Sequence, residues 1–265
     1  MEEISNSSGP EIPEKTENRE NEKPKPVILR VIALTVALMA VILPVLGGLV
    51  LGKVIKFNDP AGLRGADVSV YQGDIDWPVL SQQIDFVFIK ATEGSGYVDD
   101  RFAYNWEGAA AAGLPAGAYH FFSFDSSGKT QADNFIGTLK ESSGGGEMLP
   151  PVIDVEFYGD YISRPLAADE VREELRAMID EVERLCGTKP IIYCTDKAYR
   201  LYSSCFDDCP LWIRNVYFYP VGKEWTFWQF SDTETLRGYS GDEKYIDMNV
   251  FDGTASELKK LMIRL

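Results

Sequence analysis

Hydrophobic and polar positions divide the N-terminal part of the chain into contrasting stretches. Residues 1–26 are rich in Glu, Pro, Asn and Ser and contain almost no large apolar side chains. Such a stretch cannot bury enough apolar surface to order itself, so we expect a disordered tail there. From Val31 to Gly52, by contrast, 22 consecutive residues carry no charge. A helix of that length spans roughly 33 Å, which is enough to cross a hydrocarbon core of about 30 Å. The pattern therefore predicts a transmembrane helix over residues 27–52, followed by a linker over residues 53–61.

A cleaved signal peptide is the alternative to a membrane anchor for this apolar run. The anchor is favoured because the preceding region is long, the run itself is long, and no clear small-x-small cleavage site follows it. More basic residues precede the run than follow it: Lys15, Arg19, Lys23, Lys25 and Arg30, against Lys53, Lys56 and Arg64. Basic residues concentrate on the cytoplasmic side of membrane spans. We therefore expect a single-pass protein of the cell membrane, with a cytoplasmic N-terminal tail and an extracellular C-terminal domain.

Residues 62–265 alternate between strand-like and helix-like patterns. Short segments rich in β-branched and aromatic residues, typical of strands, occur at 66–72, 85–92, 117–124, 150–157, 190–194, 211–217, 226–231 and 244–251. Helical patterns cover 99–112, 130–139 and 168–185, and a last helix is expected near 254, where Thr254 and Glu257 have capping-box spacing.

Strands that alternate with helices indicate a parallel sheet, and eight of them indicate a closed (β/α) barrel. The connections after the fifth strand are too short for a full set of helices. We therefore predict an α/β fold over residues 62–265: an irregular TIM-type barrel with eight strands and fewer than eight helices, preceded by the transmembrane helix.

Charge and composition narrow the classes of function. The chain has 41 acidic and 26 basic residues, a net charge of −15, and the whole excess lies in residues 57–265. Such a surface argues against nucleic acid as a partner, because proteins bind nucleic acid phosphates through clusters of Lys and Arg. The single histidine, His120, argues against His-based zinc sites and Ser-His-Asp triads, and we expect it to be a hydrogen-bonded core residue. The sequence predicts no metal and no cofactor, and it identifies no protein partner.

The four cysteines fit either disulfides or buried thiols. Cys186 is expected at the opposite end of a strand from Cys194, roughly 17 Å away, which is too far for a disulfide. A bridge between Cys205 and Cys209, or between one of these and Cys186, is geometrically easier.

Carboxylates are embedded in segments that otherwise read as buried strands. Asp67 lies in the first strand, Glu93 follows the second, Asp154 and Glu156 lie in the fourth, and Asp247 lies in the eighth. A buried carboxylate costs several kcal/mol unless it is paired or solvated, so their convergence on one cleft would explain them. Catalytic groups of such barrels project from the carboxyl ends of the strands.

The Asp154-x-Glu156 pair is the strongest catalytic candidate. Residues two apart on a strand face the same side, with Cα atoms roughly 6.6 Å apart. Two carboxyls on one face push their pKa values apart, so that one stays protonated while the other stays charged. Glycoside hydrolysis needs such a pair, in which one carboxyl is the protonated acid and the other is a charged carboxylate.

Aromatic residues and one amide are candidates for sugar binding. Tyr119, Tyr193, Trp212 and Trp228 lie in the third, fifth, sixth and seventh strands, and Gln229 follows Trp228. Sugar rings stack on aromatic faces, while their hydroxyls need polar partners. A strand aromatic is more often a core residue, and Lys90 either pairs with a site carboxylate or lines the barrel.

These motifs together resemble glycoside hydrolase family 25, the muramidase lysozymes. The resemblance covers roughly residues 62–253 and rests on DVSVYQGDIDW, FVFIKATEGSGYVDDRF, GLPAGAYHFF, LPPVIDVEF, KPIIYC, LWI, WQF and IDMNVF, in that order. It implies a barrel with few helices and hydrolysis of the β-1,4 bond between N-acetylmuramic acid and N-acetylglucosamine of peptidoglycan.

The resemblance also implies roles for individual residues. Glu156 corresponds to the general acid and Asp154 to its partner, while Asp67 and Asp247 correspond to the flanking aspartates. The remaining correspondences concern substrate binding, at Glu93, Tyr119 and Tyr193. In one mechanism the substrate's 2-acetamido group attacks the anomeric carbon with Asp154 orienting it. In the other, a carboxylate such as Asp247 activates water. We favour the first, because neighbours on one strand lie on one side of the scissile bond.

Three positions depart from the family pattern, and two other functions compete with the muramidase. Arg214 and Asn215 stand where a small residue and a nearby tyrosine are more usual, and Cys194 stands where Thr is common.

A chitinase-like hexosaminidase would carry more aspartates before the final Glu than Asp154 alone. A tethered wall-binding protein with a lysozyme fold would not require both Asp154 and Glu156.

Overall fold

The computed structural model describes residues 26–51, 60–142 and 144–265. The chain divides into two compact units, Met1–Leu49 and Val50–Leu265. The predicted tail over 1–26 and linker over 53–61 lie almost entirely outside the described residues.

The first unit contains one long apolar helix, α1 (Pro26–Leu51), which matches the predicted span. It continues through Pro44, and none of its side chains is buried by protein. Its length and composition suit a membrane crossing, but a signal sequence near the N-terminus meets the same criteria. The structure therefore shows an N-terminal apolar helix, which suggests secretion or membrane anchoring.

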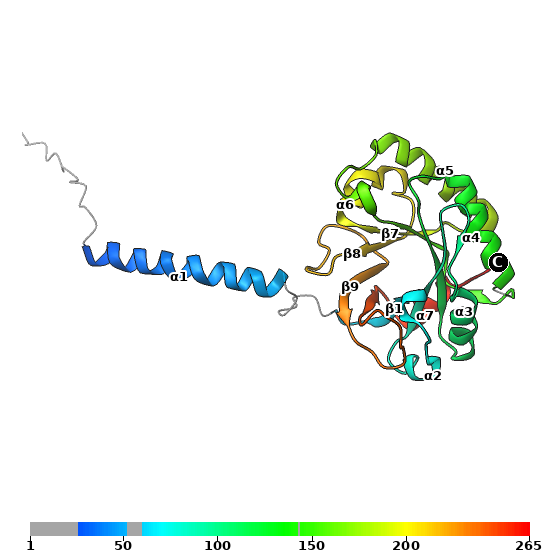
Figure 1. The fold of residues 1–265 in the computed structure, drawn as a ribbon, viewed down its shortest axis with the longest axis horizontal. Coiled ribbons are helices and arrows are strands. Elements are labelled where there is room, and N and C mark those ends of the chain that lie inside the picture. Colours follow the sequence, from blue (N-terminus) through cyan, green and yellow to red (C-terminus); the bar gives the residue numbers. More distant parts are fainter. Residues whose placement is uncertain (1–25, 52–59, 143) are drawn as a thin grey trace, which may run out of the picture. The chain divides into compact units, whose positions relative to one another are not determined.

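The second unit is built on a closed barrel (Figure 1), in which all eight predicted strands are present. The barrel strands are β1 (Leu63–Val68), β2 (Phe86–Glu93), β4 (Ala116–Phe121), β6 (Val152–Val155), β7 (Ile191–Thr195), β8 (Leu211–Arg214), β9 (Phe227–Glu234) and β10 (Ile246–Phe251). A short strand β3 (Tyr97–Val98) forms a hairpin on β2, and β5 (Glu147–Met148) pairs with β11 (Ile263–Arg264) in a separate sheet.

The direction of the last strand differs from the prediction of a parallel sheet. Among the eight barrel strands, every neighbouring pair from β1 to β9 is parallel, whereas β10 is antiparallel to both β9 and β1. The connection from β9 to β10 contains no helix, and antiparallel neighbours need no helical crossover. The barrel is therefore mixed, and its closure depends on an antiparallel strand.

Helices are unevenly distributed around the barrel. They are α2 (Trp77–Leu80), α3 (Phe102–Ala111), α4 (Gly128–Ser142), α5 (Ala168–Cys186), α6 (Asp196–Tyr202) and α7 (Ala255–Leu261), with 3-10 turns η1 (Val70–Gln72), η2 (Gly159–Ile162) and η3 (Ser203–Cys205). In Figure 1, α3, α4 and α5 lie along one side, and β8 and β9 lie on the other. No α-helix connects β8, β9 and β10 in this fully described segment, which confirms the predicted shortage of helices.

The helical patterns form the predicted elements. The stripe on α5 buries Val171, Leu175, Met178, Ile179 and Val182. Thr254 and Glu257 form the predicted capping box of α7, in which each side chain bonds the other's backbone N–H.

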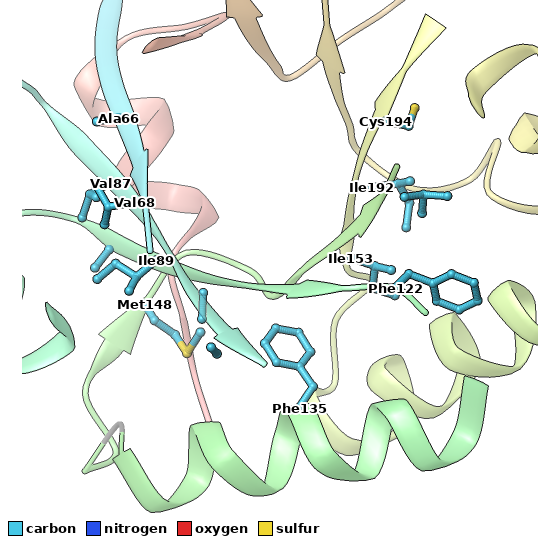
Figure 2. Packing of buried hydrophobic residues seen from close by; sticks show 14 of the residues in the cluster. Ala66, Val68, Val87, Ile89, Phe122, Phe135, Met148, Ile153, Ile192 and Cys194 are labelled. Atoms are coloured by element: carbon cyan, nitrogen blue, oxygen red, sulfur yellow. The ribbon is translucent and has the colours of Figure 1, made fainter. Parts of the chain in front are cut away.

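Two apolar layers hold the barrel together because strand residues alternate between its two faces. One layer fills the interior, where the Phe88 ring lies 4.5 Å from Trp212 and 5.1 Å from Phe227. The other layer lies outside the barrel. Figure 2 shows Val87, Ile89 and Ile153 in this outer cluster, to which Phe135 of α4 contributes its ring.

The cysteines and the histidine have structural surroundings. All four cysteines are free thiols, so the disulfides considered for Cys205, Cys209 and Cys186 are absent. His120 is fully buried and lies 2.7 Å from the Thr92 hydroxyl and 3.1 Å from Gln131 Oε1. Burial lowers the pKa of His120 to about 4, so this side chain is a neutral core residue at physiological pH.

Candidate functional site

The largest convergence of predicted site residues is a cleft of about 400 Å³ at the carboxyl ends of the parallel strands. Its lining includes seven of them: Asp67, Tyr119, Asp154, Glu156, Tyr193, Trp212 and Asp247. They come from β1, β4, β6, β7, β8 and β10, and Glu156 directly follows β6. The barrel therefore assembles side chains that are as much as 180 positions apart (67 to 247) into one cavity.

Asp154 and Glu156 face the same cavity, as their spacing requires. Asp154 is only 7% exposed, and its Oδ1 atom has no hydrogen-bond partner among the described residues. Burial raises the pKa of Asp154 well above its usual value, and the nearby Glu156 carboxylate raises it further. Burial and the Glu156 charge thus both favour a proton on Asp154.

Glu156 is more accessible and better supported than Asp154. The Tyr193 hydroxyl lies 3.1 Å from Glu156 Oε1 and 2.8 Å from Gln229 Oε1. Burial raises the pKa of Glu156, whereas the Arg214 charge and the Tyr193 hydrogen bond act in the opposite direction. Because both carboxyls are buried close together, the pair is favoured to carry one shared proton.

A second pair of carboxyls lies across the closing strands. Asp67 of β1 and Asp247 of β10 are directly opposite each other in the antiparallel register. The Gln229 amide donates to both, at 3.1 Å to Asp67 Oδ2 and 3.2 Å to Asp247 Oδ2. Burial, followed by the charge of Asp67, raises the pKa of Asp247 to about 8.

Asp67 has the better hydrogen bonds of this second pair. Asn249 Nδ2 donates to Asp67 Oδ2 at 2.7 Å, in addition to the bond from Gln229. Burial still raises the pKa of Asp67, while these two donors lower it. The pair thus concentrates two proton-holding groups on the wall formed by β1 and β10.

The aromatic candidates divide between the two faces of the barrel wall. Tyr193 and Trp212 are neighbours in register and line the cleft, with ring centroids 4.6 Å apart, and Trp212 Nε1 donates to Asn249 Oδ1 at 2.9 Å. Trp228 lies on the outer face, where its Nε1 donates to the Asn215 carbonyl oxygen at 2.9 Å. Trp228 is therefore not among the residues that line the described cleft, because strand alternation turns it away.

Two polar candidates act from behind or beside the cleft. Gln229 is almost completely buried and connects the Tyr193 hydroxyl with both flanking aspartates. Glu93 is not among the cleft-lining residues, but it accepts a hydrogen bond of 2.8 Å from Lys90, which does line the cleft. Lys90 also lies 5.1 Å from the centre of the Phe121 ring.

Sequence reasoning missed several cleft residues. The 3-10 turn η1 adds Tyr71, the connection before β10 adds Glu243 and Tyr245, and the end of β9 adds Asp232. Asn249, which is buried behind the lining and donates to Asp67, was also missed. It was detectable, because it lies two positions after Asp247 on the same strand and therefore faces the same side.

The site offers proton transfer and polar contacts rather than an evident metal centre. Within the described residues, no group of three or more His, Cys, Asp or Glu side chains is arranged to hold a metal ion. Adjacent carboxyls with raised pKa values, one of them accessible, are suited to general acid catalysis of glycosidic bond cleavage.

Comparison with known proteins identifies the family of this chain. The sequence profile described as "Glycosyl hydrolases family 25" matches residues 66–239. The chain belongs to this family. It is thus a lysozyme-like glycoside hydrolase, and the family match includes Asp67, Asp154 and Glu156.

Solved family 25 structures share this fold. A family 25 glycosyl hydrolase from Bacillus anthracis is 44% identical, with 77% of this chain and 96% of that chain covered and a TM-score of 0.69. The bacterial lysozyme from Streptomyces coelicolor is 33% identical, with coverage of 77% and 98% and a TM-score of 0.65. Lysozyme M1 from Streptomyces globisporus is 34% identical over 220 residues, covering 77% of this chain and 72% of the relative.

Proposed function

We propose that this family 25 hydrolase is a muramidase that cleaves the β-1,4 bond between N-acetylmuramic acid and N-acetylglucosamine in peptidoglycan. The observation that carries the proposal is the placement of Asp154 and Glu156 in one cleft, with pKa values raised by burial. Similar proteins named lysozyme and N,O-diacetylmuramidase support the choice of bond.

Glu156 is the proposed general acid. It is more exposed than Asp154, so it can reach the leaving-group oxygen of a bound glycan. The Tyr193 hydroxyl fixes one carboxyl oxygen of Glu156, which orients the group for proton transfer. Asp67 and Asp247 are proposed to stabilise the positive charge that develops on the sugar ring in the transition state.

Asp154 is proposed to orient the substrate's 2-acetamido group. In this mechanism the acetamido N–H donates to Asp154 while the acetamido oxygen attacks the anomeric carbon. The new hydrogen bond favours the charged form of Asp154, so the shared proton moves to Glu156. Glu156 then protonates the departing oxygen as the glycosidic bond breaks. Substrate binding thereby places the proton on the group that donates it in the reaction.

The remaining candidates are proposed to bind the glycan. Tyr119, Tyr193 and Trp212 form the aromatic part of the lining, and Gln229 fixes the polar groups behind it. Glu93 is proposed to act through Lys90, whose ammonium it holds at the cleft. Because of its outer-face position, Trp228 has no proposed part in glycan contact.

We further propose that α1 anchors the enzyme in the cell membrane, with residues 1–26 in the cytoplasm and the barrel outside. The support is the long uncharged helix and the excess of basic residues before it. A membrane tether holds an enzyme near the wall polymer and raises its local concentration there.

The direct test uses full-length protein in detergent, incubated with purified peptidoglycan beside its Glu156→Gln variant. The identity of the new reducing ends is measured after chemical reduction. Muramic acid ends from the parent protein, absent with the variant, are expected. Glucosamine ends would show a different bond specificity. Wall binding without cleavage would show that the protein binds the cell wall and is not an enzyme.

A further inference from the structure

The segment between β8 and β9, residues 215–226, is an exposed aromatic loop on the side of the barrel without helices. Phe218, Tyr219 and Val221 are 57%, 56% and 80% exposed. None of these three lines the catalytic cleft. Exposed apolar groups gathered on one loop indicate a contact surface rather than chance exposure.

The loop packs on an aromatic cluster formed by Tyr219, Trp225 and Trp228. The Tyr219 ring lies 5.9 Å from Trp225 and 5.3 Å from Trp228, and Trp225 lies 5.8 Å from Trp228. Trp228 in turn bonds the Asn215 carbonyl, which ties the start of the loop to β9. These aromatic side chains therefore support the exposed part of the loop, on a side of the barrel that no described helix covers.

A continuous set of contacts connects this loop with the start of the barrel. Trp228 lies 6.1 Å from Phe230, and the Arg64 guanidinium lies over the Phe230 ring at 5.6 Å. Arg64 also donates to the carbonyl of Pro60, the first described residue after α1. The aromatic loop thus belongs to the same part of the barrel surface as the point where the chain from α1 arrives.

We propose that the aromatic loop docks on the lipid interface of the membrane that holds α1, and so sets the orientation of the barrel on the bilayer. This inference rests on the proposed anchor. Only residues 52–59 separate Leu51 from Pro60, and an extended chain of that length spans at most about 30 Å. Tyr and Trp with adjacent apolar groups are typical of side chains at membrane interfaces.

Charge indicates the kind of lipid contact. Lys223, the basic residue of the loop, pairs with Asp196 at 2.8 Å and lies over the Tyr199 ring. With a net charge of −15, the chain gains no long-range attraction to anionic lipid. Docking therefore depends on short-range burial of apolar side chains and should resist salt.

The test uses full-length protein reconstituted in phosphatidylcholine vesicles with brominated acyl chains. Val221→Trp adds a reporter at the loop tip, and Ile162→Trp adds one at a control position that is 59% exposed on η2. The added emission of V221W should be quenched about twofold more than that of I162W, because an interfacial side chain lies roughly 5–10 Å into the headgroup boundary. This difference should persist in high salt.

Anchoring and docking fail in distinguishable ways. Release of the full-length protein from the vesicles by alkaline carbonate would overturn the anchor, and with it the docking. Retention with equal quenching at the two positions, or quenching that salt abolishes, would overturn the docking alone. Cleavage of soluble glycan fragments by both variants confirms that each is folded.

Discussion

At the residue scale, chemistry depends on how two neighbouring carboxyls share a proton. Asp154 is deeper and has an unpartnered oxygen, whereas Glu156 is accessible and receives a hydrogen bond from Tyr193. In the proposed mechanism, Glu156 gains the proton only when the substrate's amide supplies Asp154 with the donor it lacks.

Replacing Glu156 with Gln should remove most activity without removing substrate binding. Glutamine keeps the shape and can still accept from Tyr193, but it has no acidic proton to give. We expect a loss of at least about 10²-fold in kcat on peptidoglycan. Glu173→Gln, at an exposed position on α5, is the matched control and should keep full activity. Equal activity of the two variants would remove Glu156 from the mechanism.

Replacing Tyr193 with Phe should shift the pH dependence of the reaction. The Tyr193 hydroxyl lowers the pKa of Glu156, so its loss should raise that pKa further. Because a general acid must be protonated, the alkaline limb of the kcat/KM profile should move to higher pH. A profile lowered uniformly, with no shift of this limb, would indicate that Tyr193 only shapes the cleft.

At the element scale, the antiparallel closure of the barrel places Asp67 opposite Asp247. The folded protein holds a proton on Asp247 up to a pKa of about 8, whereas an unfolded aspartate releases it near pH 4. Between these values the unfolded state binds fewer protons, so the free energy of unfolding falls as pH rises. The raised pKa of Asp247 therefore lowers the free energy of unfolding as pH rises from about 4 to about 8.

Asp247→Asn should therefore stabilise the protein more at alkaline than at acidic pH. Asparagine retains an oxygen that accepts from Gln229, but it has no proton to lose. The gain in free energy of unfolding over the parent should be larger at pH 9 than at pH 5 by at least about 1 kcal/mol. Urea unfolding of both proteins at the two pH values measures this gain in free energy of unfolding. An equal difference at both would contradict the raised pKa.

The sequence predicted which segments are strands but not how the last one runs. Short runs rich in β-branched and aromatic residues located all eight barrel strands, and the two-residue spacing placed Asp154 and Glu156 on one face, because both properties are local. Periodicity has no direction, so the antiparallel β10, and with it the Asp67–Asp247 pair, could not be predicted. The same alternation turns Trp228 outward, yet the aromatic pattern alone did not indicate which face it occupies.

Short elements and loop residues were beyond the sequence pattern for a different reason. α2 and α6 have 4 and 7 residues, too few to show a clear helical stripe. Tyr71 reaches the cleft from a three-residue 3-10 turn, and Glu243 and Tyr245 reach it from a loop, whose course depends on tertiary contacts. Asn249 could have been included from its spacing to Asp247.

At the scale of the whole molecule, the chain combines a catalytic barrel with an apolar N-terminal helix. As an anchor, α1 should remain attached to the mature protein. Mass spectrometry of the protein from the membrane fraction should therefore find the N-terminal residues together with the barrel. A shorter chain that begins after α1 and is soluble in the medium would identify the helix as a signal peptide.

The central claim is that Asp154 and Glu156 act on one side of the bond with help from the substrate's acetamido group. The most direct measurement is the configuration of the first muramic acid ends formed, observed by proton NMR before mutarotation. Two displacements at the same carbon retain configuration, so the account predicts the β-anomer. The α-anomer appearing first would contradict it and would favour a water activated from the opposite face by a carboxylate such as Asp247.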